Sequence, residues 1–545
     1  MAEAIGILGI VGVVDICCKW GKKLVGICEA LKHADTQLDE NIFLLEARWL
    51  RIEDQLQMVR KMEPLLDDRH RGVQQRSLEI VLAKLKVAIS KLDGLITKPD
   101  LAQGPLARPE VKKLKYAFVK DGLAEAILEL ERWQQIFDPS WFLMLRIADP
   151  QVDSLLAASA HGGPSTSLPA AQAMRRAIND STGGTDRPSI YLSLEGLVAG
   201  SIRPVPFSTA STARRADNQQ SVLLDPVTCA SRTSANAMIR DIRNFARSLR
   251  HADPSTYGLL ECKGILKQEE GDEALAGTGA TPIFPAGLAF VFRLPATHLH
   301  VECLRARLLG GADRVHDSLS ERFALARQMA VAVSYVHLYG FVHKNIRPET
   351  ILLCHPQLPG TILGKGAGIA EVARETVALV GFDVLRKAEG KTSRQGDEDW
   401  EKNLYRHPQR QGLSLHVDYE MRHDIYSLGV CLLEIGLWES FVDYRAGSGA
   451  LLLGPGLGVL DGGMSGPELL KGPERVKGHL LRLARGLLRR KMGTVYGKVV
   501  ETCLTCLDKD NVDFGDEKEF QDEDGVVVGV RYIEKVVVRL GEITA

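Results

Sequence analysis

The sequence predicts a multidomain protein in which an N-terminal all-α helical bundle precedes a C-terminal α+β domain. Three observations lead to this prediction. Apolar residues recur every three or four positions in the first part of the chain. Strand-like and helical segments alternate further on, and a segment rich in Ser, Ala, Gly and Pro lies between the two parts. We therefore expect a bundle at residues 1–148, a flexible linker with room for one short helix at 149–215 and a second domain at 216–545.

The composition is that of a folded protein and excludes some classes of function. Of 545 residues, 45% are hydrophobic and 25% are charged, and the formal net charge is -1. A balance so close to zero gives no case for nucleic-acid binding. The cysteines are scattered and do not form the paired spacing of a zinc site, so we expect no metal and a reducing compartment, the cytoplasm.

The first helix is apolar on every face, since residues 4–14 carry no charge. This stretch is too short to span a bilayer, and the start of the chain lacks the basic residues of a signal peptide. The helix is either a membrane-interfacial or self-associating segment, or a buried helix at the end of a bundle. The candidates for membrane insertion are Ile5, Leu8, Ile10, Val11 and Val14. The candidates for binding lipid head groups are Lys19, Lys22, Lys23, Lys112, Lys113 and Lys115, although lysines more often only solvate a helix face.

The following segments carry the apolar stripes of packed helices. Steps of four and three residues join Leu38, Ile42, Leu45, Trp49, Ile52, Leu56 and Val59, and then Leu78, Leu82, Leu85, Ile89, Leu92 and Ile96. A looser stripe runs from Leu114 to Phe137. The breaks between the stripes are short, which favours antiparallel neighbours in an up-down bundle over one long coiled coil.

The run from His343 to Leu353 has the spacing of a catalytic loop, and it resembles that of the protein kinases. In that family an Asp in this loop accepts the proton of the substrate hydroxyl, and an Asn five residues later holds a magnesium ion. The corresponding positions here are Asn345 and Thr350. Neither residue provides a carboxylate base or the expected metal ligand.

Later landmarks of a kinase-like domain follow in the expected order. Gly381 stands where the metal-binding Asp of the family would be, and Pro408 lies in a segment that resembles the end of an activation segment. Asp424 begins a long apolar helix, where the resemblance implies that it braces the backbone beside His343. A literal Asp-Phe-Gly at residues 513–515 comes too late in the chain, and we expect it in a solvated loop.

The segment before the loop fits the smaller, strand-rich half of such a domain. We expect strands at residues 221–228, 257–266 and 287–295 and a helix at 233–249. The first strand has no Lys for the ATP phosphates, and Val227 occupies its expected position. No glycine-rich phosphate loop precedes it. The resemblance therefore implies a pseudokinase, not an enzyme, with weak or absent ATP binding and no cofactor.

An uncharged glycine-containing helix, a bundle and a degenerate kinase-like domain, in this order, resemble a known arrangement. Residues 1–148 resemble the HeLo-type (prion-inhibition and propagation) domain of fungal cell-death proteins, and the whole order resembles that of the necroptosis executioner pseudokinases. The resemblance implies a cell-death or defence effector whose pseudokinase controls a membrane-disrupting bundle. It also implies self-association through the bundle, an upstream activating protein, anionic lipid as a partner, and relocation from the cytoplasm to the plasma membrane. The alternative is a signalling scaffold whose pseudokinase binds a partner and whose bundle oligomerises without any membrane step. A third possibility is a residual kinase that uses unorthodox residues.

Overall fold

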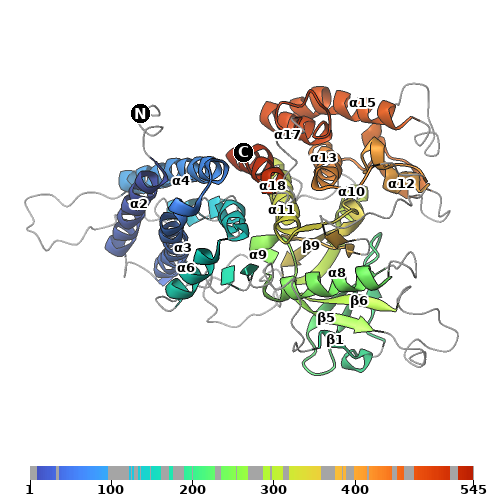
Figure 1. Cartoon of the computed structure of the whole chain (residues 1–545), viewed down its shortest axis with the longest axis horizontal. Coiled ribbons are helices and arrows are strands. Elements are labelled where there is room, and N and C mark those ends of the chain that lie inside the picture. The colour runs from blue at the N-terminus through green and yellow to red at the C-terminus, as the bar shows by residue number, and fades with distance from the viewer. Residues whose placement is uncertain are drawn as a thin grey trace, which may run out of the picture. The chain divides into compact units, whose positions relative to one another are not determined.

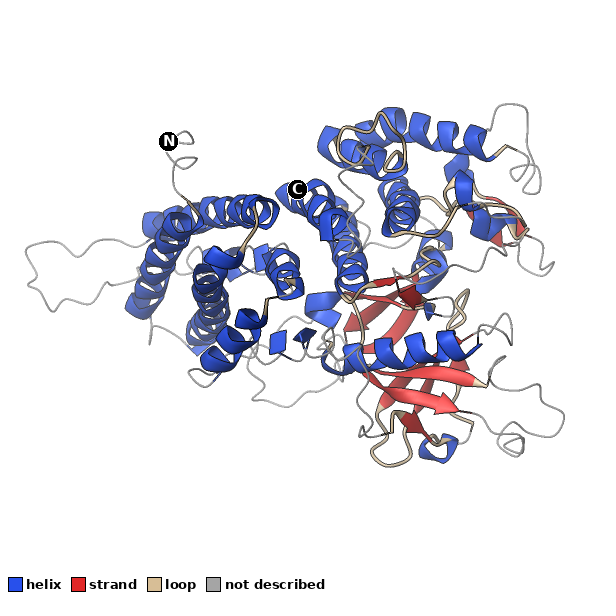
Figure 2. Ribbon diagram, in the orientation of Figure 1, coloured by secondary structure: helices blue, strands red, loops and turns tan. Residues whose placement is uncertain are grey.

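The computed structural model divides the chain into two compact units. The first is Met1–Arg175, and the second is formed by Arg176–Gln357 and Ala373–Ala545. The first contains helices and the second mixes sheets with helices (Figure 2). The structure describes residues 9–31, 36–95, most of 122–160, four positions between 171 and 175, 189–227 except 199, 235–267 except 253, 287–294, 298–310, 318–356, 375–387 except 383 and 384, 398–413, 417–444, 451–458, 472–515 and 526–543.

The helical unit is built on the stripes that the sequence predicts. Its long helices are α2 (Ile10–Leu31), α3 (Thr36–Met62) and α4 (Asp68–Leu95), labelled in Figure 1. The stripe residues that can be described are at most 1% exposed: Ile42, Leu45, Trp49, Ile52, Leu56, Val59, Leu78, Leu82, Leu85 and Ile89. Leu38, Leu92 and Ile96 have side chains outside the described part of the chain. Because these stripes form the core, the predicted helical N-terminal unit is confirmed.

A glycine allows α2 and α3 to pack closely. A Cβ built on Gly21 would lie 1.7 Å from Cζ2 of Trp49, inside the van der Waals radius of the ring. Trp49 is 1% exposed, so its indole fills the space that a side chain at position 21 would need. Gly26, on the same helix, has no atom within 4 Å of its built Cβ.

The described membrane-insertion candidates lie in or beside the core of this unit. Ile10 is 1% exposed and Val14 is 0% exposed, whereas Val11 is half-buried. Ile5 and Leu8 lie outside the described residues. In this conformation α2 is a packed helix of the unit, so insertion of Ile10 and Val14 in a membrane requires α2 to leave its neighbours.

The start of the predicted linker, residue 149, is wrong. Residues 150–160 form α6 (Pro150–Ala160), which packs on α3. Arg175, 4% exposed, donates to Asp153 at 3.1 Å and to the carbonyl oxygens of Leu145, Ile147 and Asp149. The stretches rich in Gly, Ser and Pro that suggested a linker, within residues 161–170 and 176–188, lie outside the described part of the chain.

The end of the predicted linker is wrong as well, because three strands of the second unit precede residue 216. The strands are β1 (Tyr191–Leu192), β2 (Arg203–Pro204) and β3 (Ser211–Arg214). They join a six-stranded sheet in the order β1-β5-β6-β4-β3-β2. Strands this short do not show an alternating apolar pattern, so their sequence resembles that of a loop.

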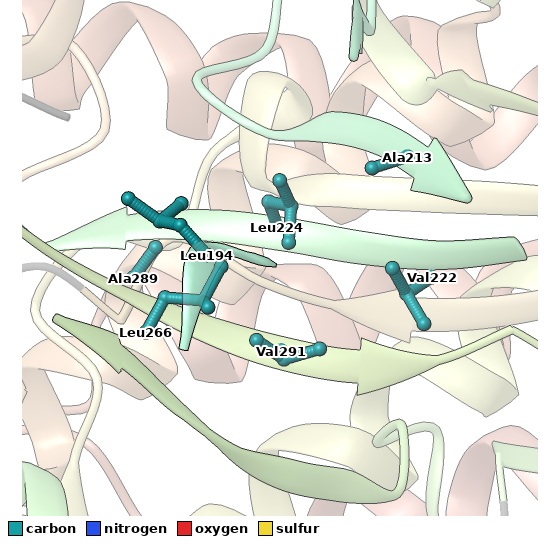
Figure 3. Close-up of a cluster of buried hydrophobic side chains, with 7 residues drawn as sticks. All are labelled: Leu194, Ala213, Val222, Leu224, Leu266, Ala289 and Val291. Atoms are coloured by element: carbon teal, nitrogen blue, oxygen red, sulfur yellow. The ribbon is translucent and has the colours of Figure 1, made fainter. Parts of the chain in front are cut away.

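The centre of this sheet contains the strands that the sequence predicts. These are β4 (Ser221–Val227), β5 (Cys262–Lys267) and β6 (Leu288–Arg293), and β6 pairs antiparallel with both of the others. A cluster of buried side chains covers one face, as Figure 3 shows: Leu194, Ala213, Val222, Leu224, Leu266, Ala289 and Val291. Helix α8 (Ala235–Ser248) contacts the sheet, with Phe245 in edge-on contact with Phe290.

The rest of the second unit is mainly helical. It contains a three-stranded sheet of β7 (His298–Cys303), β9 (Ile351–Pro356) and β10 (Thr376–Leu379). Two further pairs of strands are β8 (Phe341–Val342) with β11 (Arg386–Lys387), and β12 (Val442–Tyr444) with β13 (Leu451–Leu453). Its helices include α10 (Leu304–Leu309), α11 (Leu319–Leu338), α13 (Met421–Leu437), α15 (Pro473–Leu483), α17 (Thr494–Leu504), α18 (Val526–Tyr532) and α19 (Arg539–Glu542). Helix α13 is buried along its length and packs on α11 and α17.

The segment 513–515 is not the solvated loop that the sequence predicts. Phe514 is 0% exposed, and Asp513 accepts hydrogen bonds from Thr502 and Arg539 at 3.0 and 3.2 Å. The acidic sequence around it suggested solvent, but an arginine of α19 pairs with this carboxylate. The segment therefore helps to fix α19 to α17.

Candidate functional site

Asp424 holds the backbone of the loop at residues 343–350. Its two carboxylate oxygens accept from the backbone N–H groups of His343 and Lys344 at 2.7 and 2.9 Å. The hydroxyl of Tyr419 donates to the same carboxylate at 2.7 Å, and the ring of His337 lies 3.1 Å away. Burial on its own would raise the pKa of Asp424, but these hydrogen bonds hold the pKa below its usual value. This bracing is the arrangement that the sequence predicts.

The polar side chains of this loop bind one another. Thr350 Oγ1 donates to the carbonyl of Asn345 at 2.8 Å, and Arg347 Nε donates to Asn345 Oδ1 at 3.0 Å. Asn345 Nδ2 donates to the carbonyl of Gly381 at 3.3 Å. The structure therefore brings together the three residues that the sequence singled out at positions 345, 350 and 381.

Gly381 has no room for a side chain. Its φ is 81°, and a Cβ at this position would lie 2.4 Å from Cγ2 of Thr350 and 3.2 Å from Nδ2 of Asn345. A larger residue would meet both a strained backbone and two occupied neighbours. The space beside Gly381 is thus already filled by Thr350 and Asn345.

Sequence reasoning missed Asp225, which lies at the centre of this site. Its carboxylate, 0% exposed, accepts from the backbone N–H groups of Gly381 and Phe382 at 2.9 and 3.2 Å. Val227, which the sequence analysis placed at the position of the strand lysine, is buried two positions further along β4. The available signal was an acidic residue within an otherwise apolar strand, which is rare unless the charge has partners.

His343 connects the loop to the same position. Its ring lies 3.0 Å from the carbonyl oxygen of Val380 and contacts the ring of Phe382, with centroids 4.8 Å apart. Burial lowers the pKa of His343 to about 4, although the nearby Asp424 opposes this shift. The imidazole is therefore neutral at pH 7 and acts as a packing and hydrogen-bonding group.

A buried arginine ties the loop to the helical part of the unit. Arg305, 0% exposed, donates to Glu349 at 2.9 Å and to Glu434 at 2.8 Å. Tyr405 donates to the other oxygen of Glu434 at 2.8 Å. One guanidinium thus serves two carboxylates from separate elements, which fixes the position of the loop relative to α10 and α13.

Pro408 lies in a short helical turn whose cap is a histidine. Pro408 begins a 3-10 helix, and His407 Nδ1 accepts from the N–H of Gln409 at 3.3 Å. At the start of α13, His423 Nδ1 accepts from the N–H of Glu420 at 3.1 Å. Burial, together with neighbouring positive charges, lowers the pKa of both histidines to about 3.

The described lipid head-group candidates are exposed. Lys19, Lys22 and Lys23 lie on the outer face of α2, and Lys23 Nζ is 5.4 Å from the ring centre of Trp20. Lys86 of α4, which sequence reasoning did not name, approaches the same ring at 5.8 Å. Lys112, Lys113 and Lys115 lie outside the described residues.

No group of three or more His, Cys, Asp or Glu in the described part of the chain is arranged to hold a metal ion. No helix among those residues has the length and apolar character to cross a membrane. In comparisons with known proteins, no family model and no curated protein matches the chain.

Proposed function

We propose that the second unit is a protein-kinase-like domain that does not transfer phosphoryl groups. The observation that carries the proposal is Asp225, which binds the backbone of Gly381 and Phe382 from β4. In the family that the sequence resembles, a lysine of this strand meets the phosphates, and an acidic residue at the position of Gly381 meets the metal. In this chain β4 carries the negative charge of Asp225 in place of the positive charge of that lysine.

The charges and the available space both oppose nucleotide chemistry. A buried carboxylate in place of the lysine repels phosphates, and Gly381 provides no metal ligand. Asn345 has no carboxylate to accept a proton from a hydroxyl. ATP binding is therefore weak or absent, and the unit acts by binding a partner, such as an upstream activating protein.

This proposal is tested with the purified full chain. We expect no magnesium-dependent transfer from ATP to the chain itself or to a generic acceptor protein. We also expect no recovery in Asn345→Asp, because the metal and lysine positions remain empty. Gly381→Asp should lower the melting temperature, since the new side chain meets Thr350. The proposal would be overturned by robust phosphoryl transfer that persists in Asp225→Asn and is lost in Asn345→Ala.

For the whole chain we propose a cell-death or defence effector in which this domain controls the helical unit. In support, Lys23 and Lys86 lie near the ring of Trp20, a side chain suited to a membrane interface, and Lys19 and Lys22 are exposed on the same helix. The chain is then cytoplasmic and self-associates through the helical unit, and it relocates to the plasma membrane on activation. Because Ile10 and Val14 are buried, activation must first release α2.

A vesicle-leakage assay on the full chain and on residues 1–175 tests the effector function. We expect leakage of anionic vesicles by the fragment and less by the full chain. Lys19→Glu with Lys23→Glu should reduce leakage about tenfold or more, because each lysine is worth about 1 kcal/mol at an anionic surface. Lys498→Glu, at an exposed lysine of the second unit, is the matched control for the full chain. Self-association without leakage on any lipid mixture would favour the signalling scaffold.

A further inference from the structure

The loop between β2 and β3 is a short turn with an unusual residue at its tip. The N–H of Val205 donates to the carbonyl oxygen of Ala210 at 2.9 Å, and the N–H of Ser208 donates to the carbonyl oxygen of Val205 at 3.0 Å. Phe207 at the tip has a φ of 63° and is 42% exposed. This left-handed conformation is disfavoured for a residue with a Cβ.

Two contacts connect this loop to segments that follow the six-stranded sheet in sequence. The thiol of Cys303, at the end of β7, donates to the carbonyl of Pro206 at 3.1 Å. The ring of Phe207 packs on Tyr444 of β12, with centroids 4.9 Å apart. Tyr444 in turn donates through its hydroxyl to Glu349 Oε1 at 2.9 Å, which also accepts from Arg305. The loop tip is therefore connected to the buried arginine and to the loop of Asn345.

The sequence of the β2–β3 loop suits a fixed contact more than a phosphate cradle. Loops that cradle phosphates use glycines so that the backbone can approach the ligand. Residues 203–214 contain no glycine, and Pro204 and Pro206 stiffen the approach to Phe207. The strained backbone of Phe207 therefore lies in a rigid loop, and this conformation places the ring of Phe207 against Tyr444.

We propose that residues 205–210 are a lid and that Phe207 latches it onto Tyr444, so that the six-stranded sheet is held against the helical part of the unit without any ligand. Asp225, which binds Gly381 and Phe382, is a second tie between the same two parts. Release of the latch removes one of the contacts between these two parts while Asp225 and the ring contacts of Phe382 remain, so the N–H groups of Gly381 and Phe382 stay bonded but exchange faster with solvent. The lid is a regulatory device that goes beyond the absence of phosphoryl transfer, and its test needs no nucleotide.

Amide hydrogen exchange on the full chain tests the latch. We expect Phe207→Gly and Tyr444→Ala each to speed exchange at Gly381, Phe382 and β3 by about tenfold, roughly the worth of one aromatic pair. Phe207→Gly removes the ring and the backbone strain but adds backbone freedom, so Tyr444→Ala, which leaves the loop sequence unchanged, must show the same increase. Phe207→Tyr keeps the ring and should behave like the wild type. Leu413→Ala, at a 60% exposed apolar residue elsewhere in the unit, is the control for surface truncation.

The double variant separates a latch from two independent effects. If Phe207 and Tyr444 act on each other, Phe207→Gly with Tyr444→Ala exchanges no faster than either single variant. Two results would overturn the proposal. In the first, the increases in exchange rate of the two single variants multiply in the double variant. In the second, Phe207→Gly exchanges at the wild-type rate. Exchange in α17 reports general loss of stability, so an equal increase there would overturn it too.

Discussion

Close packing at Gly21 makes this residue a sensitive position of the helical unit. Gly21→Ala places a methyl group inside the ring of Trp49, and overpacking of this kind costs about 1–3 kcal/mol. Gly26→Ala on the same helix meets no atom and should stabilise the unit by up to about 1 kcal/mol through helix propensity. Hydrogen exchange of the α2 and α3 amides in the full chain measures both. Equal effects of the two variants would mean that Trp49 does not pack on Gly21.

Asp424 carries several hydrogen bonds at once, so its loss should be costly. Asp424→Ala leaves two backbone N–H groups and the hydroxyl of Tyr419 without this acceptor, at about 1–3 kcal/mol for each buried group. We expect a large fall in the melting temperature of the second unit. Asp424→Asn keeps one carbonyl oxygen and should lose less. An unchanged melting temperature in Asp424→Ala would contradict the bracing role.

Asp424 and Asp225 show why one residue of the site was predictable and the other was not. Asp424 lies at a fixed spacing from a recognisable helix and follows the motif at His343, so its position could be read from the order of the landmarks. Asp225 depends on the register of β4, and a shift of two residues keeps the same face of a strand. Val227 fits the apolar pattern equally well, so only the hydrogen bonds to Gly381 and Phe382 distinguish the two.

At the scale of elements, neutral histidines at helix starts make stability depend on pH. The pKa values of His407 and His423 are about 3 and that of His343 is about 4, below the ordinary value of about 6.5. The unfolded chain therefore binds more protons below pH 6.5, so stability falls as the pH is lowered from 6.5 to 5. Each histidine contributes up to about 1.4 kcal/mol per pH unit, in a range above most carboxylate titrations.

Urea unfolding of the full chain at pH 5, 6 and 7 measures this slope. His407→Asn keeps a side-chain acceptor for the N–H of Gln409 but cannot titrate, so it should flatten the slope. His355 acts in the opposite direction. Burial would lower its pKa, but hydrogen bonds to Glu302 and Glu375 raise it to about 9, so its contribution is lost as the pH rises from 6.5 to 9. A free energy of unfolding that rises as the pH is lowered from 7 to 5 would contradict the role of the capping histidines His407 and His423.

Elements also differ in how well the sequence predicted them. The stripes of α3 and α4 were predictable because each core residue repeats the helical spacing over many turns. The strands β1 to β3 have two to four residues each, too few for an alternation to show. β1 pairs with β5, β3 pairs with β4, and β2 pairs with β3 at the edge of the sheet, and such pairing is not visible in local composition.

At the scale of the whole molecule, the boundary between the units is testable. Residues 1–175 include α6 and Arg175, whose guanidinium binds three carbonyl groups between residues 145 and 149. We expect residues 1–175 to fold with the helicity of the intact unit and residues 1–148 to melt at a lower temperature. Arg175→Ala in the longer fragment should reproduce part of the loss. Equal melting temperatures of the two fragments, measured by circular dichroism, would place the boundary at the predicted position.

The contacts around Gly381 also limit how this chain can evolve. Asp225→Lys removes the acceptor for two N–H groups, and Gly381→Asp meets Thr350. Thr350→Asn loses the hydroxyl that donates to the carbonyls of Asn345 and Arg347. Each of these changes toward the residues of a kinase site therefore costs stability by itself, because no single change supplies the whole set. Under the function proposed above, selection acting on one mutation at a time would meet a loss of stability at every such change, which would keep the site as it is.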